Sequence, residues 1–249
     1  MDMDKQRRRT LRLLAGATAA VALAAGIAPA SWAAPARTGR ERRIGIIGAG
    51  QVGSTLGRLW IESGHRVMFA SRHPDRLGGL VAELGERAGA GSPAEAARFG
   101  EIVLLAVPYG ALPQLGRDLA PLLRGKPVLD ATNPYRWRDG EAADLAERQG
   151  VGLTSAGYFP DAHLVRGFNS IDASAVAGNA HKASPAIGIP LAGDDQAALE
   201  EVSALVRDAG FEPVVAGPLA SARLFQPGTP LFRQVMSAER LRSRLDEQR

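Results

Sequence analysis

Three glycines, Gly48, Gly50 and Gly53, form a GxGxxG pattern directly after an apolar run at residues 44–47. In a strand–turn–helix unit, the first glycine allows a tight turn, the second lets a pyrophosphate approach the backbone, and the third lets the helix pack closely on the strand. The free N–H groups and the dipole at the start of that helix also favour negative charge. The pattern therefore predicts a dinucleotide site at Gly48, Ala49, Gly50, Gln51, Val52 and Gly53.

The flanking residues support this interpretation, because the pattern alone is weak evidence in a chain with 29 glycines. Residues 54–63 read as an amphipathic helix with Leu56, Leu59 and Trp60 on its apolar side, and residues 65–70 read as a second strand. These elements supply the βαβ context that the pattern requires. The alternative is that the glycines only make a strand–helix turn.

The end of the second predicted strand indicates which dinucleotide is bound. NAD-preferring sites carry a carboxylate about 20 residues after the glycine pattern, where it binds the adenosine ribose 2′-hydroxyl. Here that place holds Ser71 and Arg72, and Arg76 follows shortly after. A hydroxyl and a guanidinium satisfy a 2′-phosphate with charge-assisted hydrogen bonds, whereas a carboxylate would repel it. These residues favour NADP(H), with solvated surface charges at Arg72 and Arg76 as the alternative.

Apolar runs alternate with helical patterns along the rest of the chain. Continuous apolar runs between helices indicate parallel strands covered on both faces, so we expect an α/β fold with a doubly wound, Rossmann-type, mostly parallel sheet and a short C-terminal helical segment. Strands are expected at residues 101–107, 127–131, 163–168, 186–192 and 212–215, and a loop at 149–162. Helices are expected at residues 75–87, 92–99, 110–123 and 195–209, and after Gly217-Pro218.

Ligands of such a sheet bind outside the carboxyl ends of the strands, where the strand order reverses. Uncharged groups at these ends suit a nicotinamide carboxamide or a bound hydride acceptor, although each could instead cap a strand end. We place Val107, Pro108, Thr132 and Asn133 in the cofactor site. The catalytic residues are left unassigned, and the candidates are Tyr109, Asn133 and Asn169, with Tyr135 as a further acid.

In these motifs the chain resembles the NADPH-dependent coenzyme F420 reductase-like dinucleotide-binding proteins. The resemblance covers most of residues 43–235 and implies a Rossmann domain whose C-terminal helical segment closes the pocket. It also implies hydride transfer between NADP(H) and a flavin-like deazaflavin. The motifs that carry it, in order, are Gly48-Ala49-Gly50-Gln51-Val52-Gly53, Ser71-Arg72, Ala106-Val107-Pro108, Asp130-Ala131-Thr132-Asn133-Pro134, Gly167-Phe168-Asn169-Ser170-Ile171 and Ala216-Gly217-Pro218-Leu219-Ala220-Ser221-Ala222-Arg223.

The chemistry of the predicted pocket bears on the acceptor. Asn169 stands where F420 reductases carry a histidine near the deazaflavin, so the acceptor itself is left open between coenzyme F420 and a flavin. Reduction of a carbonyl needs a positioned acid, whereas a flavin-type ring spreads the developing charge over its own atoms. We therefore expect an NADP(H)-dependent oxidoreductase with a flavin-like or quinone-like small-molecule acceptor. The alternative is a non-catalytic, exported NADP(H)-binding protein.

Residues 1–34 are predicted to be a secretory signal of the twin-arginine type. Arg8-Arg9 precedes an apolar, Ala-rich run at residues 13–28, and small residues suited to cleavage end at Ala33-Ala34. Cleavage would leave no membrane span and a periplasmic or other extracytoplasmic location, with the twin-arginine export machinery as a partner. An uncleaved membrane anchor is the alternative. We expect a linker at residues 35–41, the Rossmann domain at 42–235 and a helical tail at 236–249.

Composition limits the remaining classes of function. The formal net charge is +4, and residues 1–34 hold five basic and two acidic side chains, so cleavage would leave a nearly neutral chain. This gives no support to nucleic-acid binding. The chain has no cysteine, and its four histidines, at 65, 73, 163 and 181, show no metal-ligand spacing, so no metal is expected. A homodimer is left open as an assembly.

Overall fold

The computed structural model describes residues 40–182 and 184–248. These described residues form one compact unit. The predicted export signal at residues 1–34 and most of the predicted linker lie outside the described residues. The predicted domain at 42–235 and the predicted tail at 236–249 both fall within this one unit.

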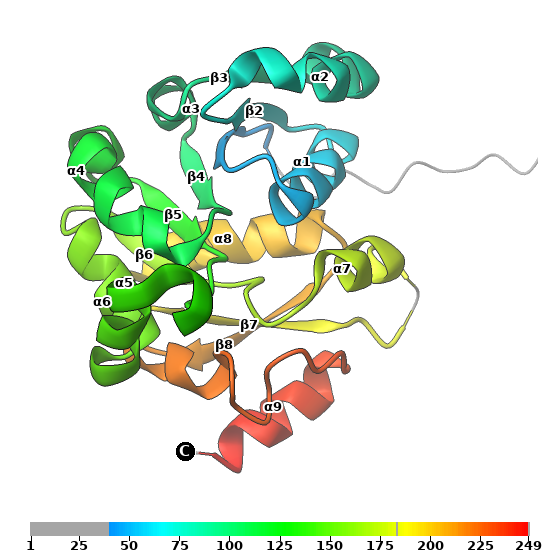
Figure 1. Ribbon diagram of the computed structural model, residues 1–249. Coiled ribbons are helices and arrows are strands. Elements are labelled where there is room, and N and C mark those ends of the chain that lie inside the picture. The colour runs from blue at the N-terminus through cyan, green and yellow to red at the C-terminus, as the bar shows by residue number, and fades with distance from the viewer. Residues whose placement is uncertain (1–39, 183, 249) are drawn as a thin grey trace, which may run out of the picture. The chain divides into compact units, whose positions relative to one another are not determined.

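Eight strands of the described chain form one sheet in the order β3-β2-β1-β4-β5-β6-β7-β8 (Figure 1). Neighbouring strands are parallel except for β6 and β7, which are antiparallel. The predicted doubly wound, mostly parallel α/β fold is confirmed. The strands are β1 (Arg43–Ile47), β2 (Arg66–Ala70), β3 (Ala88–Gly91), β4 (Ile102–Leu105), β5 (Pro127–Asp130), β6 (His163–Arg166), β7 (Gly188–Gly193) and β8 (Glu212–Gly217).

Polar side chains cap the starts of several helices. Ser92 and Glu95 form a capping box at the start of α3, and the Asp195 carboxylate accepts a hydrogen bond from the Ala198 N–H at the start of α8. The α-helices are α1 (Gln51–Glu62), α2 (Gly78–Leu84), α3 (Pro93–Phe99), α4 (Leu112–Leu123), α5 (Arg136–Gln149), α6 (Val151–Tyr158), α7 (Ala173–Asn179), α8 (Gln196–Asp208) and α9 (Ala238–Asp246). Short 3₁₀ turns are η1 (Pro74–Leu77), η2 (Gly85–Arg87), η3 (Tyr109–Ala111) and η4 (Leu219–Phe225).

Helices cover both faces of the sheet, which is why β4, at its centre, is apolar and buried at every position. On one face, Leu56 of α1 and Val202 of α8 pack with Ile46 of β1. On the other face, Leu119 of α4 packs with Val103 of β4. Successive residues of a strand point to opposite faces, so each central strand contributes to both cores.

The order of the strands reverses between β1 and β4, because β2 lies on one side of β1 and β4 lies on the other. Ile47 at the end of β1 pairs with Ala70 of β2 and with Leu105 of β4. The loops after these strands therefore open at the same edge of the sheet, next to the turn between β1 and α1. This edge is where an open parallel sheet binds its ligands.

Several predicted elements differ from the structure. The predicted loop at 149–162 contains α6, and the sequence analysis missed α5, α7 and β3. Two glycines, Gly152 and Gly157, weaken the helical signal of α6, but Val151 is buried in the core and stabilises the helix through packing. The strand β3 has the sequence Ala-Gly-Ala-Gly, which carries no strand signal of its own.

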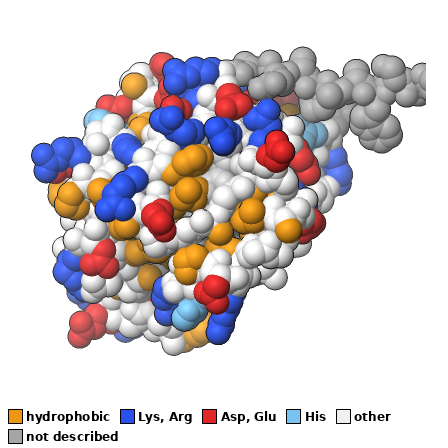
Figure 2. Space-filling model, turned by 90° about the horizontal axis from the view of Figure 1, so that it is seen from above, with side chains coloured by type: hydrophobic (Ala, Val, Ile, Leu, Met, Phe, Trp, Pro, Cys, Tyr) orange, Lys and Arg blue, Asp and Glu red, His pale blue; other side chains and the backbone are white. Residues whose placement is uncertain are grey.

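The C-terminal helix α9 packs against β7 and β8 and buries Leu241 and Leu245 there. None of the helices in the described chain is long and apolar enough to cross a membrane. On the face shown in Figure 2, Lys and Arg side chains lie among Asp, Glu and hydrophobic side chains. Charge of both signs is therefore mixed over that face.

Candidate functional site

The glycine turn joins the end of β1 to α1, and its three glycines meet different surroundings. Gly48 has φ of +108°, and a Cβ atom there would lie 2.3 Å from the Ala106 carbonyl oxygen. A Cβ atom at Gly53 would lie 2.0 Å from the Gly48 carbonyl oxygen. At Gly50, with φ of −75°, a Cβ atom would meet no protein atom within 4 Å. The fold therefore requires glycine at 48 and 53, whereas no contact within the described protein requires it at Gly50.

The start of α1 is suited to an anion. Gly50 is the N-cap of α1 and provides no side-chain cap, and the first turn of the helix holds no acidic residue. Its backbone N–H groups and the positive end of the helix dipole are therefore available to a phosphate.

Two adjoining cavities open at the carboxyl edge of the sheet. The first cavity, of about 290 Å³, is lined by Gly50, Gln51, Val52, Ala106, Val107, Pro108, Ala131, Thr132, Asn133, Tyr135 and Arg138. The second cavity, of about 320 Å³, is lined by Gln51, Val52, Ala131, Asn133, Tyr135, Phe168, Asn169, Ile171, Asp172, Ala173, Ser174 and Phe232. They share Gln51, Val52, Ala131, Asn133 and Tyr135. A ligand in one cavity would thus lie beside a ligand in the other.

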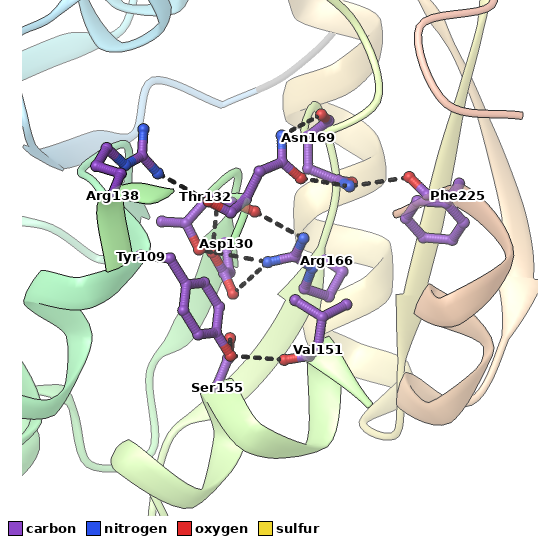
Figure 3. A network of polar contacts seen from close by, with 10 residues as sticks. Tyr109, Asp130, Thr132, Arg138, Val151, Ser155, Arg166, Asn169 and Phe225 are labelled. Atoms are coloured by element: carbon purple, nitrogen blue, oxygen red, sulfur yellow. Dashed lines mark hydrogen bonds and ion pairs between the residues drawn. The ribbon is translucent and has the colours of Figure 1, made fainter. Parts of the chain in front are cut away.

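A buried ion pair supports the loop beneath both cavities. Asp130 at the end of β5 and Arg166 at the end of β6 are neighbours in the sheet, and neither is exposed to solvent. The Arg166 Nη1 donates to Asp130 Oδ2 at 2.7 Å, and Nη2 donates to the Thr132 carbonyl oxygen at 2.7 Å (Figure 3). The ion pair therefore fixes the backbone of the loop that begins at Ala131.

Thr132 completes this network. Its hydroxyl donates to Asp130 Oδ1 at 2.6 Å, and its backbone N–H donates to the same oxygen at 2.9 Å. Because the hydroxyl proton is used inside the protein, the side chain of Thr132 caps the strand end, which was the alternative interpretation of this residue. Thr132 still lines the first cavity, as predicted for a residue of the cofactor site.

Asn133 and Asn169 form a pair of amides between the two cavities. Asn133 Nδ2 donates to the Asn169 carbonyl oxygen at 2.7 Å, and Asn169 Nδ2 donates to Asn133 Oδ1 at 3.3 Å. Asn169 Nδ2 also donates to the carbonyl oxygen of Phe225 at 3.0 Å (Figure 3). The structure thus brings these two predicted residues into direct contact.

Arg138 also lines the first cavity, and the sequence analysis did not single it out. Its Nε and Nη2 donate to the carboxylate of Asp139 at 3.0 and 2.9 Å, and Nη2 also donates to the Asn133 carbonyl oxygen at 2.9 Å. The guanidinium lies 5.1 Å from the ring centre of Tyr135 and 5.9 Å from that of Trp137. A basic and aromatic run directly after a strand-end loop was the signal that could have revealed it.

The carboxylate of Asp139 holds the guanidinium of Arg138 in place. Burial disfavours its charged form, but hydrogen bonds from Arg138 and from the N–H groups of Gly110 and Tyr135 outweigh burial and lower the pKa of Asp139. The carboxylate is therefore charged at neutral pH and fixes the guanidinium at the cavity wall.

The residues predicted to bind a 2′-phosphate lie beyond these two cavities. Ser71 follows β2 directly, and β2 reaches the glycine turn through a 3.1 Å hydrogen bond from the Gly48 N–H to the Ala70 carbonyl oxygen. Arg72 and Arg76 are exposed, and within the described residues neither forms an ion pair with a carboxylate. All three residues lie on the β2 side of the glycine turn, as the predicted adenosine end of the site requires.

Residues 43–134 match the family described as NADP oxidoreductase, coenzyme F420-dependent. This part of the chain is therefore similar to that family. It is also 33% identical over 187 residues to metalloreductase STEAP3 of Rattus norvegicus, a match that covers 73% of this chain and 35% of that protein. The chain thus spans about a third of the length of the curated relatives it matches.

Solved structures support the fold assignment. A hypothetical protein, SMa0349 of Sinorhizobium meliloti, is 28% identical with a TM-score of 0.68, covering 80% of this chain and 96% of that one. The 3-hydroxyisobutyrate dehydrogenase of Mycobacterium tuberculosis is 16% identical with a TM-score of 0.53, covering 74% and 57%. The second likeness concerns the fold alone.

The structure places the candidate residue Tyr109 inside the protein core. Tyr109 is fully buried, donates its hydroxyl proton to the Val151 carbonyl oxygen at 3.2 Å, and accepts a hydrogen bond from Ser155. Burial raises the pKa of its hydroxyl well above the ordinary value. Tyr109 lines neither cavity, so its hydroxyl holds α6 in place and does not face a ligand.

Proposed function

We propose that the protein transfers a hydride between NADPH in the first cavity and a flavin-like or deazaflavin (F420-type) acceptor in the second. The observation that carries this proposal is that the two cavities adjoin and share five lining residues. Hydride transfer requires the two rings to lie within contact distance, and adjoining cavities provide that. On transfer, NADPH becomes NADP⁺, and the acceptor ring takes up the hydride and one proton from water.

The residues of the site fit this chemistry. Gly50 leaves the approach to the α1 N-terminus open, and Arg138, held by Asp139, adds a guanidinium to the wall of the same cavity. Within the described lining of both cavities there is no Lys or His that could protonate a carbonyl substrate, and Tyr135 is the one candidate acid that lines them. A flavin-type ring needs no such acid, because its own nitrogens and carbonyls accept the developing charge.

The acceptor is tested by following NADPH oxidation by the purified full chain with coenzyme F420, flavins, quinones and ferric chelates. Ferric chelates belong in the panel because matched relatives are metalloreductases. We expect oxidation with F420 or a flavin. Tight NADPH binding without oxidation by any acceptor would favour the non-catalytic alternative, and oxidation with simple ketones alone would contradict the proposal.

Arg72 is expected to select NADPH over NADH. The change Arg72→Ala should weaken NADPH binding by about 1.5–3 kcal/mol, roughly 10- to 150-fold, because a charge-assisted hydrogen bond to the 2′-phosphate is lost. NADH binding should not change. Fluorescence titration of both nucleotides measures this difference.

Arg124→Ala is the matched control for Arg72→Ala. Arg124 is another exposed arginine, but it precedes β5 and so lies at the opposite edge of the sheet. Its loss should leave both affinities unchanged. If Arg72→Ala weakened NADH as much as NADPH, the 2′-phosphate assignment would be wrong.

We propose further that residues 1–34 direct export by the twin-arginine route, on the basis of Arg8-Arg9 before an Ala-rich apolar run. The double change Arg8→Lys and Arg9→Lys keeps the charge but removes the planar guanidinium groups, so the precursor should remain in the cytoplasm. Cell fractionation and mass spectrometry of the exported chain measure this. Unimpaired export would favour the general secretory route.

A further inference from the structure

We infer that Asn169 is a positioning residue that orients the amide of Asn133 so that Asn133 binds the carboxamide of the nicotinamide ring. This inference rests on the proposed use of NADPH. Asn133 follows β5 and lines both cavities, so its side chain lies at their junction. A hydride can pass between the cavities only from a ring at that junction, and the nicotinamide is the ring that carries it.

The orientation of the Asn133 amide follows from the type of its partner. Its Nδ2 lies 2.7 Å from the Asn169 main-chain oxygen, which can only accept a hydrogen bond. The opposite amide orientation would place two acceptors face to face at this distance. The oxygen of the Asn133 amide therefore points to Asn169 Nδ2, 3.3 Å away.

The orientation of Asn169 is fixed in the same way from another element. Its Nδ2 lies 3.0 Å from the main-chain oxygen of Phe225, at the end of η4 (Figure 3). Phe225 is fully buried and Asn169 is 3% exposed, so the frame that holds the amide is rigid. The C-terminal part of the fold thus sets the direction of a side chain at the cavity junction.

The Asn169 side chain also lowers the stability of the folded protein in one respect. Its Oδ1 is buried without a hydrogen-bond partner among the described residues. A buried acceptor without a partner destabilises the folded state. The cost supports a role of this side chain other than stability, such as orienting Asn133.

The chemistry left to Asn133 identifies its ligand. A primary amide has two N–H donors and an oxygen with two lone pairs. Asn169 uses one N–H and one lone pair of the Asn133 amide. The other N–H and the other lone pair of that amide remain in fixed positions. A carboxamide offers both a matching oxygen and a matching N–H. A ring with a carbonyl substituent alone satisfies only the N–H.

The test compares NADPH with its reduced 3-acetylpyridine analogue, in which an acetyl group replaces the carboxamide and removes the N–H donor. The full chain should bind NADPH about tenfold more tightly than the analogue, since one hydrogen bond in a buried site is lost. Asn133→Ala should reduce this ratio to about one, and Asn169→Ala, which keeps the main-chain acceptor but removes the side-chain donor, should reduce it part of the way. Binding of adenosine 2′,5′-bisphosphate, which has no nicotinamide, should be unchanged in both variants.

A second variant guards against effects of side-chain size at position 169. Asn169→Asp keeps the shape but places an acceptor opposite Asn133 Oδ1, so it should lower the ratio at least as far as Asn169→Ala does. Equal affinity of the unaltered chain for both nucleotides, or a ratio unchanged in the Asn169 variants, would overturn the inference while leaving the proposed function intact. Failure of the unaltered chain to bind NADPH would instead reject the proposed function.

Discussion

Gly50→Val is expected to abolish NADPH binding while leaving the fold intact. The position has an ordinary φ of −75°, and a side chain there meets no protein atom within 4 Å of its Cβ. The added atoms would instead enter the first cavity at the start of α1, where we expect the pyrophosphate. Affinity should fall by two orders of magnitude or more, on the order of 3 kcal/mol. Circular dichroism and NADPH titration on one sample measure fold and binding together.

The other two glycines of the turn are the controls. Substituting them should destabilise the fold. Gly48→Ala and Gly53→Ala would place a methyl group 2.3 Å and 2.0 Å from main-chain oxygens, so they should lower the melting temperature strongly. If Gly50→Val retained NADPH binding, the glycine turn would serve only the fold. Loss of folding in Gly50→Val would equally contradict the assignment.

The sequence predicts the parallel part of the sheet because burial on both faces leaves a direct signal. The strands β1, β4 and β5 are apolar at nearly every position, and each was expected close to its observed bounds. The antiparallel direction of β7 relative to β6 was not predicted. Its direction depends on where the chain re-enters the sheet beside β6, which no local pattern records.

The polar helix α5 shows a different limit of sequence reasoning. It buries little beyond Ala143 and Ala146, and Gly140 interrupts it with φ of +51°. It therefore lacks the apolar stripe by which a surface helix is recognised. The helix matters because it carries Arg138 and Asp139 to the wall of the first cavity, so missing the helix meant missing the arginine.

The candidate site was predictable where a single segment determines it. The glycine turn and the loop after β5 are local features, and the structure places both at the cavities. The pairing of Asn133 with Asn169 and of Asp130 with Arg166 joins residues from neighbouring strands and depends on strand register. Charged residues inside two predicted buried strands were the available sign that Asp130 and Arg166 must meet.

Arg166→Leu is expected to lower the free energy of unfolding by about 3–5 kcal/mol, because it leaves the buried Asp130 carboxylate without its partner. The loss is a large fraction of the total stability of an ordinary domain, about 5–15 kcal/mol. Chemical denaturation followed by circular dichroism measures it. The variant should also bind NADPH more weakly, because the Thr132 carbonyl oxygen loses its hydrogen bond and the cavity loop is released.

The double variant Asp130→Leu with Arg166→Leu separates the charge from the contacts. An apolar pair of similar volume removes the uncompensated charge, so much of the lost stability should return. NADPH binding should not return with it, because Thr132 would still lack both the Asp130 acceptor and the Arg166 donor. Recovery of stability and binding together would mean that the ion pair does not position the loop. A double variant no more stable than Arg166→Leu would mean that packing at this position, and not the unpaired charge, determines the loss.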